Sequence, residues 1–175
     1  NLLGARNAEF GDILEVYTQN KLLVAAAVDD SEAILMSEFW EFATHTDIVI
    51  HIEHPIASKW IIETDKRLYI TPLIKYNVCC ALDEKDKAIL KNVLKGNSIP
   101  PEKSGPKVPF NKKDPRYKFK LEELKKTILV NKHLFFEEDA VVIPFDFKSN
   151  LFKVERRAAA DEKKLFEKNG VLISK

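Results

Sequence analysis

The strand-rich stretch 45–80 constrains the fold more than any other part of the sequence. It reads HTDIVIHIEHPIASKWIIETDKRLYITPLIKYNVCC and carries three of the four histidines. Over 47–53, isoleucines alternate with mostly polar residues, which is the period-two pattern of a half-buried strand. Ranges 59–64 and 67–78 are rich in β-branched and aromatic residues and predict a hairpin over 59–78. These strands require a mainly antiparallel sheet.

Four segments carry the spacing or the flanking residues of helices. Asp29 and its neighbours supply an N-cap for the first of these segments, 32–44, because a short side-chain oxygen accepts hydrogen bonds from the free amides of a first turn. Asp83 caps the second in the same way, and Gly96 ends it. The first is apolar around more than half of its circumference, so we expect it to be buried. The predicted helices are 32–44, 84–95, 120–130 and 157–169.

Two further segments complete the sheet. Residues 140–155 predict a hairpin in which Pro144 marks an edge strand, because proline has no amide to donate. Residues 13–28 fit either two strands joined at Gln19-Asn20 or a helix that the alanine run favours; we prefer the hairpin. The sequence therefore predicts an α+β fold with a mainly antiparallel sheet of five to seven strands.

Length and composition predict one domain over 1–175, since the chain is 45% hydrophobic and can build a core. Range 97–116 holds five of the eight prolines and predicts an extended loop or arm. Adjacent Cys79 and Cys80 give no disulfide framework, which favours a reducing, cytoplasmic compartment. No run of about 18 apolar residues occurs, so we expect no transmembrane helix and no membrane partner.

The net charge of +1 hides a separation of charge along the chain. Residues 1–56 carry 2 basic and 10 acidic residues, whereas residues 91–134 carry 12 basic and 4 acidic ones. Such a separation of charge indicates how the chain could associate with partners, and it carries no information about the fold. If the two regions form different faces, one copy can dock on the next, and such heterologous contacts close into rings or run on as filaments. The alternative is that the two regions pair within one monomer.

The basic region supplies the candidate partner-binding residues. Interleaved aromatic residues such as Tyr117 and Phe119 would also suit a nucleic-acid strand. Lysine outnumbers arginine eleven to one over 91–134. Because arginine is the usual reader of bases, any nucleic-acid contact would be directed to phosphates and would weaken with salt. The candidates are Lys103, Lys107, Lys112, Lys113, Arg116, Lys118, Lys120, Lys125 and Lys126.

Asp47, His51 and Glu53 occupy alternate positions of the predicted 47–53 strand and are candidate metal ligands. Carboxylate and imidazole groups that project from one strand face suit a facial metal site. His45 and His54 lie nearby in the sequence. The same pattern also fits the solvated face of an amphipathic strand, and no HExxH spacing is present.

The chain lacks the common catalytic and cofactor-binding motifs. None of GxGxxG, GxxxxGK or GxSxG occurs among its five glycines, so nothing predicts a cofactor. We expect the two cysteines to be buried rather than reactive. The sequence favours a non-enzymatic assembly or interaction protein that uses its acidic N-terminal and basic central regions, such as a component of a ring or virus-like particle. The alternative is a nucleic-acid-binding protein or a metal-dependent nuclease that uses the Asp47, His51 and Glu53 face with the basic 103–126 segment.

Overall fold

The computed structural model describes residues 7–18, 21–70, 74–107 and 111–131, and the backbone of four strands between 140 and 174. The chain divides into two compact units, Asn1–Pro109 and Phe110–Lys175, and each is described by itself. The single domain expected over 1–175 stays a prediction. Among the described residues, no helix is long and apolar enough to span a membrane.

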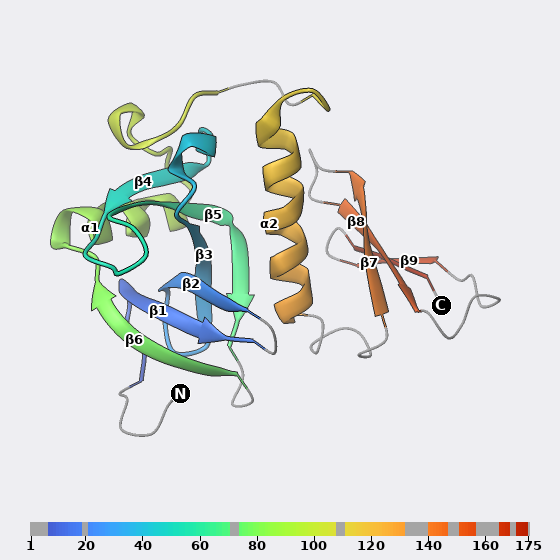
Figure 1. Cartoon of the computed structure of the whole chain (residues 1–175), viewed down its shortest axis with the longest axis horizontal. Helices are drawn as coiled ribbons and strands as arrows, with labels where there is room; N and C mark the ends of the chain where they lie inside the picture. The colour runs from blue at the N-terminus through green and yellow to red at the C-terminus, as the bar shows by residue number, and fades with distance from the viewer. Residues whose placement is uncertain are drawn as a thin grey trace. The chain divides into compact units, whose positions relative to one another are not determined.

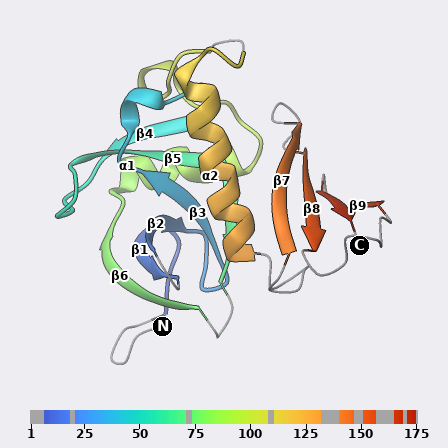
Figure 2. The same cartoon turned by 45° about the vertical axis from the view of Figure 1, so that its right-hand side comes forward.

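Six strands of the first unit form one antiparallel sheet, which is strongly curled (Figures 1 and 2). The strands are β1 (Asp12–Tyr17), β2 (Leu22–Ala27), β3 (Glu32–Ser37), β4 (Asp47–His51), β5 (Lys59–Tyr69) and β6 (Lys75–Ala81). Their order in the sheet is β4-β5-β3-β2-β1-β6, and helix α1 (Glu84–Leu94) follows β6. The predicted α+β fold with a mainly antiparallel sheet is confirmed.

The sheet buries apolar side chains on both of its faces. Ile34 and Leu35 are neighbours in β3 and both are buried, although successive strand residues point to opposite faces. Ala25 and Ala26 of β2, which pair with them, are also fully buried. On one face, Ile34 belongs to a core cluster that includes Leu90 of α1. Strands covered on both faces carry continuous apolar runs instead of an alternating pattern.

The helix predicted over 32–44 is wrong. Residues Glu32–Ser37 form β3, and only Trp40–Phe42 makes a short 3-10 turn. The physical reason is the burial of β3 on both faces. Its apolar run has no period of two, and such a run cannot be told from a buried helix by periodicity alone.

The hairpin preferred over 13–28 is confirmed, because β1 and β2 pair antiparallel in register. Asp29 accepts backbone hydrogen bonds, as expected, but it does so in a turn before a strand and not at the start of a helix. Its Oδ1 accepts hydrogen bonds from the amides of Ser31 and Glu32 at 2.8 and 2.9 Å. This side chain therefore closes the turn between β2 and β3 in the manner of an Asx turn.

The hairpin predicted over 59–78 is wrong. Residues Lys59–Tyr69 form one continuous strand, β5, which lies between β4 and β3, while β6 pairs with β1. The charged Asp65-Lys66 pair, which separates the two predicted strands, lies in a bulge. Along β3 the pairing partner shifts from Ile62 to Arg67 over two residues, so the extra residues of β5 are accommodated without reversing the chain.

The two central helix predictions are confirmed. Helix α1 begins after Asp83, whose side chain accepts a hydrogen bond from the Asp86 amide. The helix predicted over 120–130 lies within α2 (Pro115–Asn131). It begins earlier than predicted, with a proline at its first position, where the missing amide has no intrahelical partner to lose.

The second unit contains a four-stranded sheet of order β7-β8-β10-β9. Its strands are β7 (Ala140–Asp146), β8 (Leu151–Arg156), β9 (Leu165–Lys168) and β10 (Val171–Ser174). Strands β7 and β8 confirm the hairpin predicted over 140–155, and β8 pairs parallel with β10.

The helix predicted over 157–169 is wrong over 165–168, where β9 pairs antiparallel with β10. Residues 157–164 lie outside the described residues. The sequence carries a signal for this pairing, because Asn169-Gly170 between two short apolar runs is typical of a hairpin.

The first part of the predicted 97–116 loop lies along β4 of its own chain. Ser104 forms a β-bridge with Ile48, and the Gly105 amide donates to the Thr44 carbonyl at 2.9 Å. A Cβ on Gly105 would lie 2.3 Å from the carbonyl carbon of Ala43. Only glycine fits this close backbone approach.

We therefore predict that Gly105→Ala lowers the free energy of unfolding by about 3 kcal/mol, because backbone must move to relieve the contact. Gly96→Ala is the matched control. Gly96 has open space around it and a φ of 100°, so its cost of about 1 kcal/mol is conformational. Urea denaturation of both variants measures the difference. If Gly105→Ala lowered the free energy of unfolding no more than Gly96→Ala does, the close packing of Gly105 against Ala43 and Thr44 would be contradicted.

Candidate functional site

The structure does not bring Asp47, His51 and Glu53 together as one set of metal ligands. Among the described residues, they form no group of three with ligand atoms within 4.8 Å of one another. Asp47 is fully buried, and its Oδ2 accepts hydrogen bonds from the Thr44 amide at 2.8 Å and the Thr44 hydroxyl at 3.0 Å. His51 and Glu53 are exposed. Asp47 therefore stabilises the turn before β4.

Several of the nine candidate partner-binding residues are engaged within the chain. Lys120 is buried, and four others lie in ion pairs, mostly with acidic residues two or three positions away. The pairs are Lys103–Asp86 at 2.9 Å, Arg116–Asp114 at 3.6 Å, Lys125–Glu122 at 3.4 Å and Lys126–Glu123 at 2.8 Å. Local pairing therefore neutralises part of the basic region.

The remaining candidates, Lys107, Lys112, Lys113 and Lys118, are exposed. No ion pair joins any of them to another described residue. The turn before α2 is ordered by Asn111, whose Oδ1 accepts from the amide of Lys113 at 2.9 Å. Three of these lysines therefore flank the start of α2, where the helix dipole adds positive potential.

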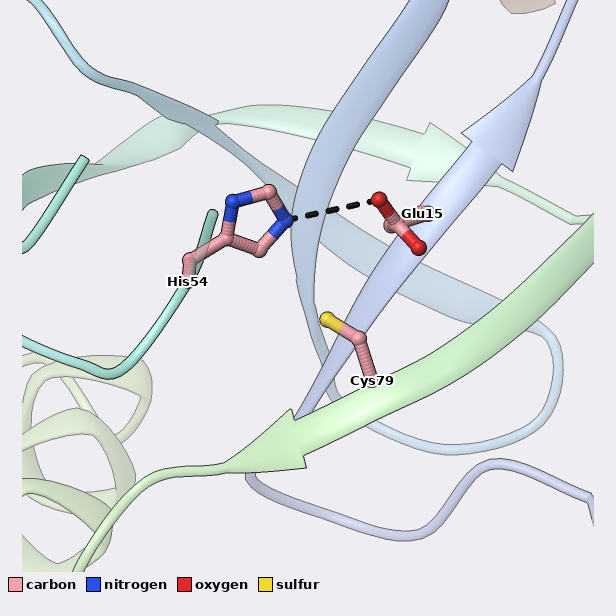
Figure 3. Close-up of side chains that lie close together, drawn as sticks. All are labelled: Glu15, His54 and Cys79. Carbon is pink, nitrogen blue, oxygen red and sulfur yellow. Dashed lines mark ion pairs between the residues drawn. The ribbon is translucent and has the colours of Figure 1, made fainter. Parts of the chain in front are cut away.

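A second cluster joins Glu15, His54 and Cys79 from three separate elements (Figure 3). Glu15 lies on β1, Cys79 on β6, and His54 in the segment between β4 and β5. His54 Nε2 is 3.4 Å from Glu15 Oε2, and one ligand atom from each residue lies within 4.8 Å of the others. The His54 side chain is 1% exposed and that of Glu15 is 20% exposed. A buried imidazole thus faces a carboxylate and a thiol.

A β-bulge places Cys79 in this cluster. Ile13 of β1 pairs with Cys80 and Leu14 pairs with Val78, so Cys79 is the extra residue on β6. Successive residues of a regular strand point to opposite faces. Here the Sγ atoms of Cys79 and Cys80 are only 3.9 Å apart. The bulge therefore places the Cys79 thiol beside His54, with the Cys80 thiol next to that of Cys79.

The orientation of the His54 ring is fixed by two contacts. Its Nδ1 accepts a hydrogen bond from the Ile56 amide at 3.1 Å. Its ring packs edge-on against Trp60, with ring centroids 5.2 Å apart. An accepting Nδ1 assigns the proton of the neutral ring to Nε2. This buried Nε2 faces Glu15 without forming a hydrogen bond.

The thiol of Cys79 is not poised for nucleophilic attack. Cys79 is an exposed residue and Cys80 is half-buried, so the expected burial of both is not observed. The Cys79 Sγ nevertheless turns inward and donates to the Ile13 carbonyl at 3.2 Å. Desolvation, reinforced by Cys80 and Glu15, raises the pKa of Cys79 to about 12. Since the thiolate is the nucleophile, the geometry gives no support to cysteine catalysis.

Comparison of the chain with known protein families, characterised proteins and solved structures finds no match. The cluster must therefore be judged from its own chemistry. His54 lies near the predicted ligands in the sequence, whereas Glu15 and Cys79 were not among the predicted site residues. The only sequence feature that could have indicated this cluster is the pair of adjacent cysteines directly after the predicted 67–78 strand. The pair indicates a site only once the bulge at Cys79 is known.

We predict that the Cys79 thiol of the metal-free Cys80→Ser variant reacts slowly with iodoacetamide at pH 8. Burial, the main cause of the raised pKa, persists in this variant. In the wild type, a pKa of about 12 leaves about one Cys79 thiolate in 10⁴ molecules at pH 8, and Cys80→Ser removes only the smaller causes of this shift. Mass spectrometry should show a rate at least about tenfold below that of the urea-unfolded chain, increasing with pH beyond 9. Equal rates in the folded and unfolded protein would contradict the desolvated thiol.

Proposed function

We propose that this chain is a non-enzymatic interaction protein that associates through Lys112, Lys113 and Lys118 with acidic surfaces on further copies of itself. The observation that carries the proposal is a difference in ion pairing among the basic residues of 112–126. These lysines are exposed, whereas Arg116, Lys125 and Lys126 are neutralised by nearby carboxylates. An exposed lysine that forms no ion pair with another described residue is available to an acidic surface.

The acidic counterpart is supplied by the first unit. Glu9, Asp30, Glu41 and Glu53 are exposed there, and residues 1–56 carry a net charge of −8. Complementary charge mainly accelerates association and selects partners. Lysine, a hydrated point charge, suits such contacts better than the bidentate recognition that arginine performs.

Association between different surfaces of identical copies is heterologous and builds closed rings or open filaments. A role in assembly, including that of a component of a ring or virus-like particle, follows from this proposal. Free Cys79 and Cys80 fit a reducing, cytoplasmic compartment.

Binding to nucleic-acid phosphates is the alternative use of the same lysines. Stacking of bases has less support. Tyr117 and Phe119 are partly buried, and the Lys120 ammonium lies 5.6 Å from the centre of the Phe119 ring. Base stacking needs free aromatic faces.

We predict that the protein sediments as an oligomer at about 0.05 M salt and dissociates at about 0.5 M, because salt screens contacts between exposed charges. The triple variant Lys112→Gln, Lys113→Gln and Lys118→Gln should be shifted toward monomer at low salt. Sedimentation velocity measures both effects.

The matched control is the triple variant Lys21→Gln, Lys75→Gln and Lys85→Gln. It removes the same charge from exposed positions elsewhere and should retain the oligomer. A wild-type monomer at both salt concentrations would rule out self-association. Salt-sensitive binding of a single-stranded oligonucleotide by that monomer would instead favour the nucleic-acid alternative.

A further inference from the structure

We propose that Glu15, His54 and Cys79 bind a thiophilic divalent cation of the zinc class. This site is independent of the lysine surface and of the charge-directed association proposed above. It combines three donor types from three elements, all with ligand atoms within 4.8 Å of one another.

The distances suit a small tetrahedral ion. Zinc bonds of about 2.0–2.3 Å hold neighbouring ligand atoms about 3.3–3.8 Å apart. His54 Nε2 and Glu15 Oε2 already have a separation of 3.4 Å. Contraction of the remaining distances by about 1 Å needs only small side-chain rotations, and Glu15 and Cys79 have the freedom for them because both lie partly at the surface.

The donor set indicates the class of cation. Imidazole nitrogen, thiolate sulfur and carboxylate oxygen are the ligands of zinc in proteins. Magnesium and calcium prefer oxygen ligands throughout, so the presence of Cys79 disfavours them. A borderline-soft divalent ion matches all three donors.

His54 is held in place before any cation binds. Packing against Trp60 leaves Nε2 buried and directed toward the other two residues, and this nitrogen has no hydrogen bond. Buried polar atoms are rarely left in this state, because desolvation is costly without a partner. A bound cation would satisfy the nitrogen directly.

Coordination through Nε2 requires a change of tautomer in His54. The ring proton would lie on Nδ1, which now accepts a hydrogen bond from the Ile56 amide. Ile56 is 52% exposed, so we expect its amide to bond to water instead. The Ile56 amide is therefore a local reporter of metal binding.

Cys80 supplies a second sulfur beside the site. Two thiolates on one tetrahedral zinc ion are about 3.8 Å apart, and the Cys79 and Cys80 sulfur atoms are 3.9 Å apart. Cys80 is therefore the residue placed to complete a four-ligand site, after its sulfur turns toward His54.

The test uses the full chain, reduced and stripped of metal with a chelator. Equilibrium dialysis should show one Zn²⁺ bound per chain, and Co²⁺ should produce thiolate-to-cobalt charge-transfer absorption. Zn²⁺ should also raise the thermal unfolding midpoint, since it binds the folded state. In the amide spectrum, the Ile56 signal should shift upon addition of Zn²⁺.

Glu15→Gln, His54→Gln and Cys79→Ser should each weaken Zn²⁺ binding by at least about tenfold, and Cys80→Ser should weaken it as well. The controls are His51→Gln and Glu53→Gln, which alter exposed potential ligands nearby and should bind as wild type does. If His54→Gln does not fold, the conservative Glu15→Gln and Cys79→Ser variants decide.

No Zn²⁺ retained by the wild type, or unchanged affinity in Glu15→Gln and Cys79→Ser, would overturn the proposed site. Loss of binding in the His51→Gln or Glu53→Gln control would place the metal elsewhere and would also overturn it. Unchanged affinity in Cys80→Ser alone would remove Cys80 from the ligand set.

Discussion

Burial of both faces of the six-stranded sheet is the constraint on which the first unit depends. A strand such as β3 buries successive residues, including Ile34 and Leu35, and so has no polar face. Polar groups must therefore lie at turns, bulges and strand edges, or be hydrogen-bonded where buried. Asp29 closes the turn between β2 and β3, and the buried Asp47 accepts two hydrogen bonds from Thr44.

The bulge between β1 and the edge strand β6 is where this arrangement produces a chemically distinct cluster. Without it, Cys79 and Cys80 would point to opposite faces of the strand. The extra residue instead brings the Cys79 thiol close to His54 and Glu15, and the Cys80 sulfur lies 3.9 Å from that of Cys79. Bulges often redirect side chains near functional sites. The positions of Lys112 and Lys113 depend on a separate feature, the ordered turn that precedes α2.

Features of the fold that depend on a local pattern could be predicted from the sequence. The two paired strands of the 13–28 hairpin and the Asp83 cap of α1 are examples. Prediction failed for β3, because a strand buried on both faces carries no alternation. The Glu15–His54–Cys79 cluster could not be predicted, since it requires β6 to pair with β1 and a one-residue bulge. Neither the strand order nor the bulge is encoded by a short motif.

Proximity of Glu15, His54 and Cys79 is the central claim, and nuclear Overhauser contacts test it most directly. In the reduced, isotope-labelled protein, the His54 ring protons should show contacts to the side chains of both Cys79 and Glu15. The cross-strand contacts should pair Leu14 with Val78 and Ile13 with Cys80. A regular β1–β6 register, with Cys79 paired to β1 and without contacts to His54, would contradict the bulge and the site together.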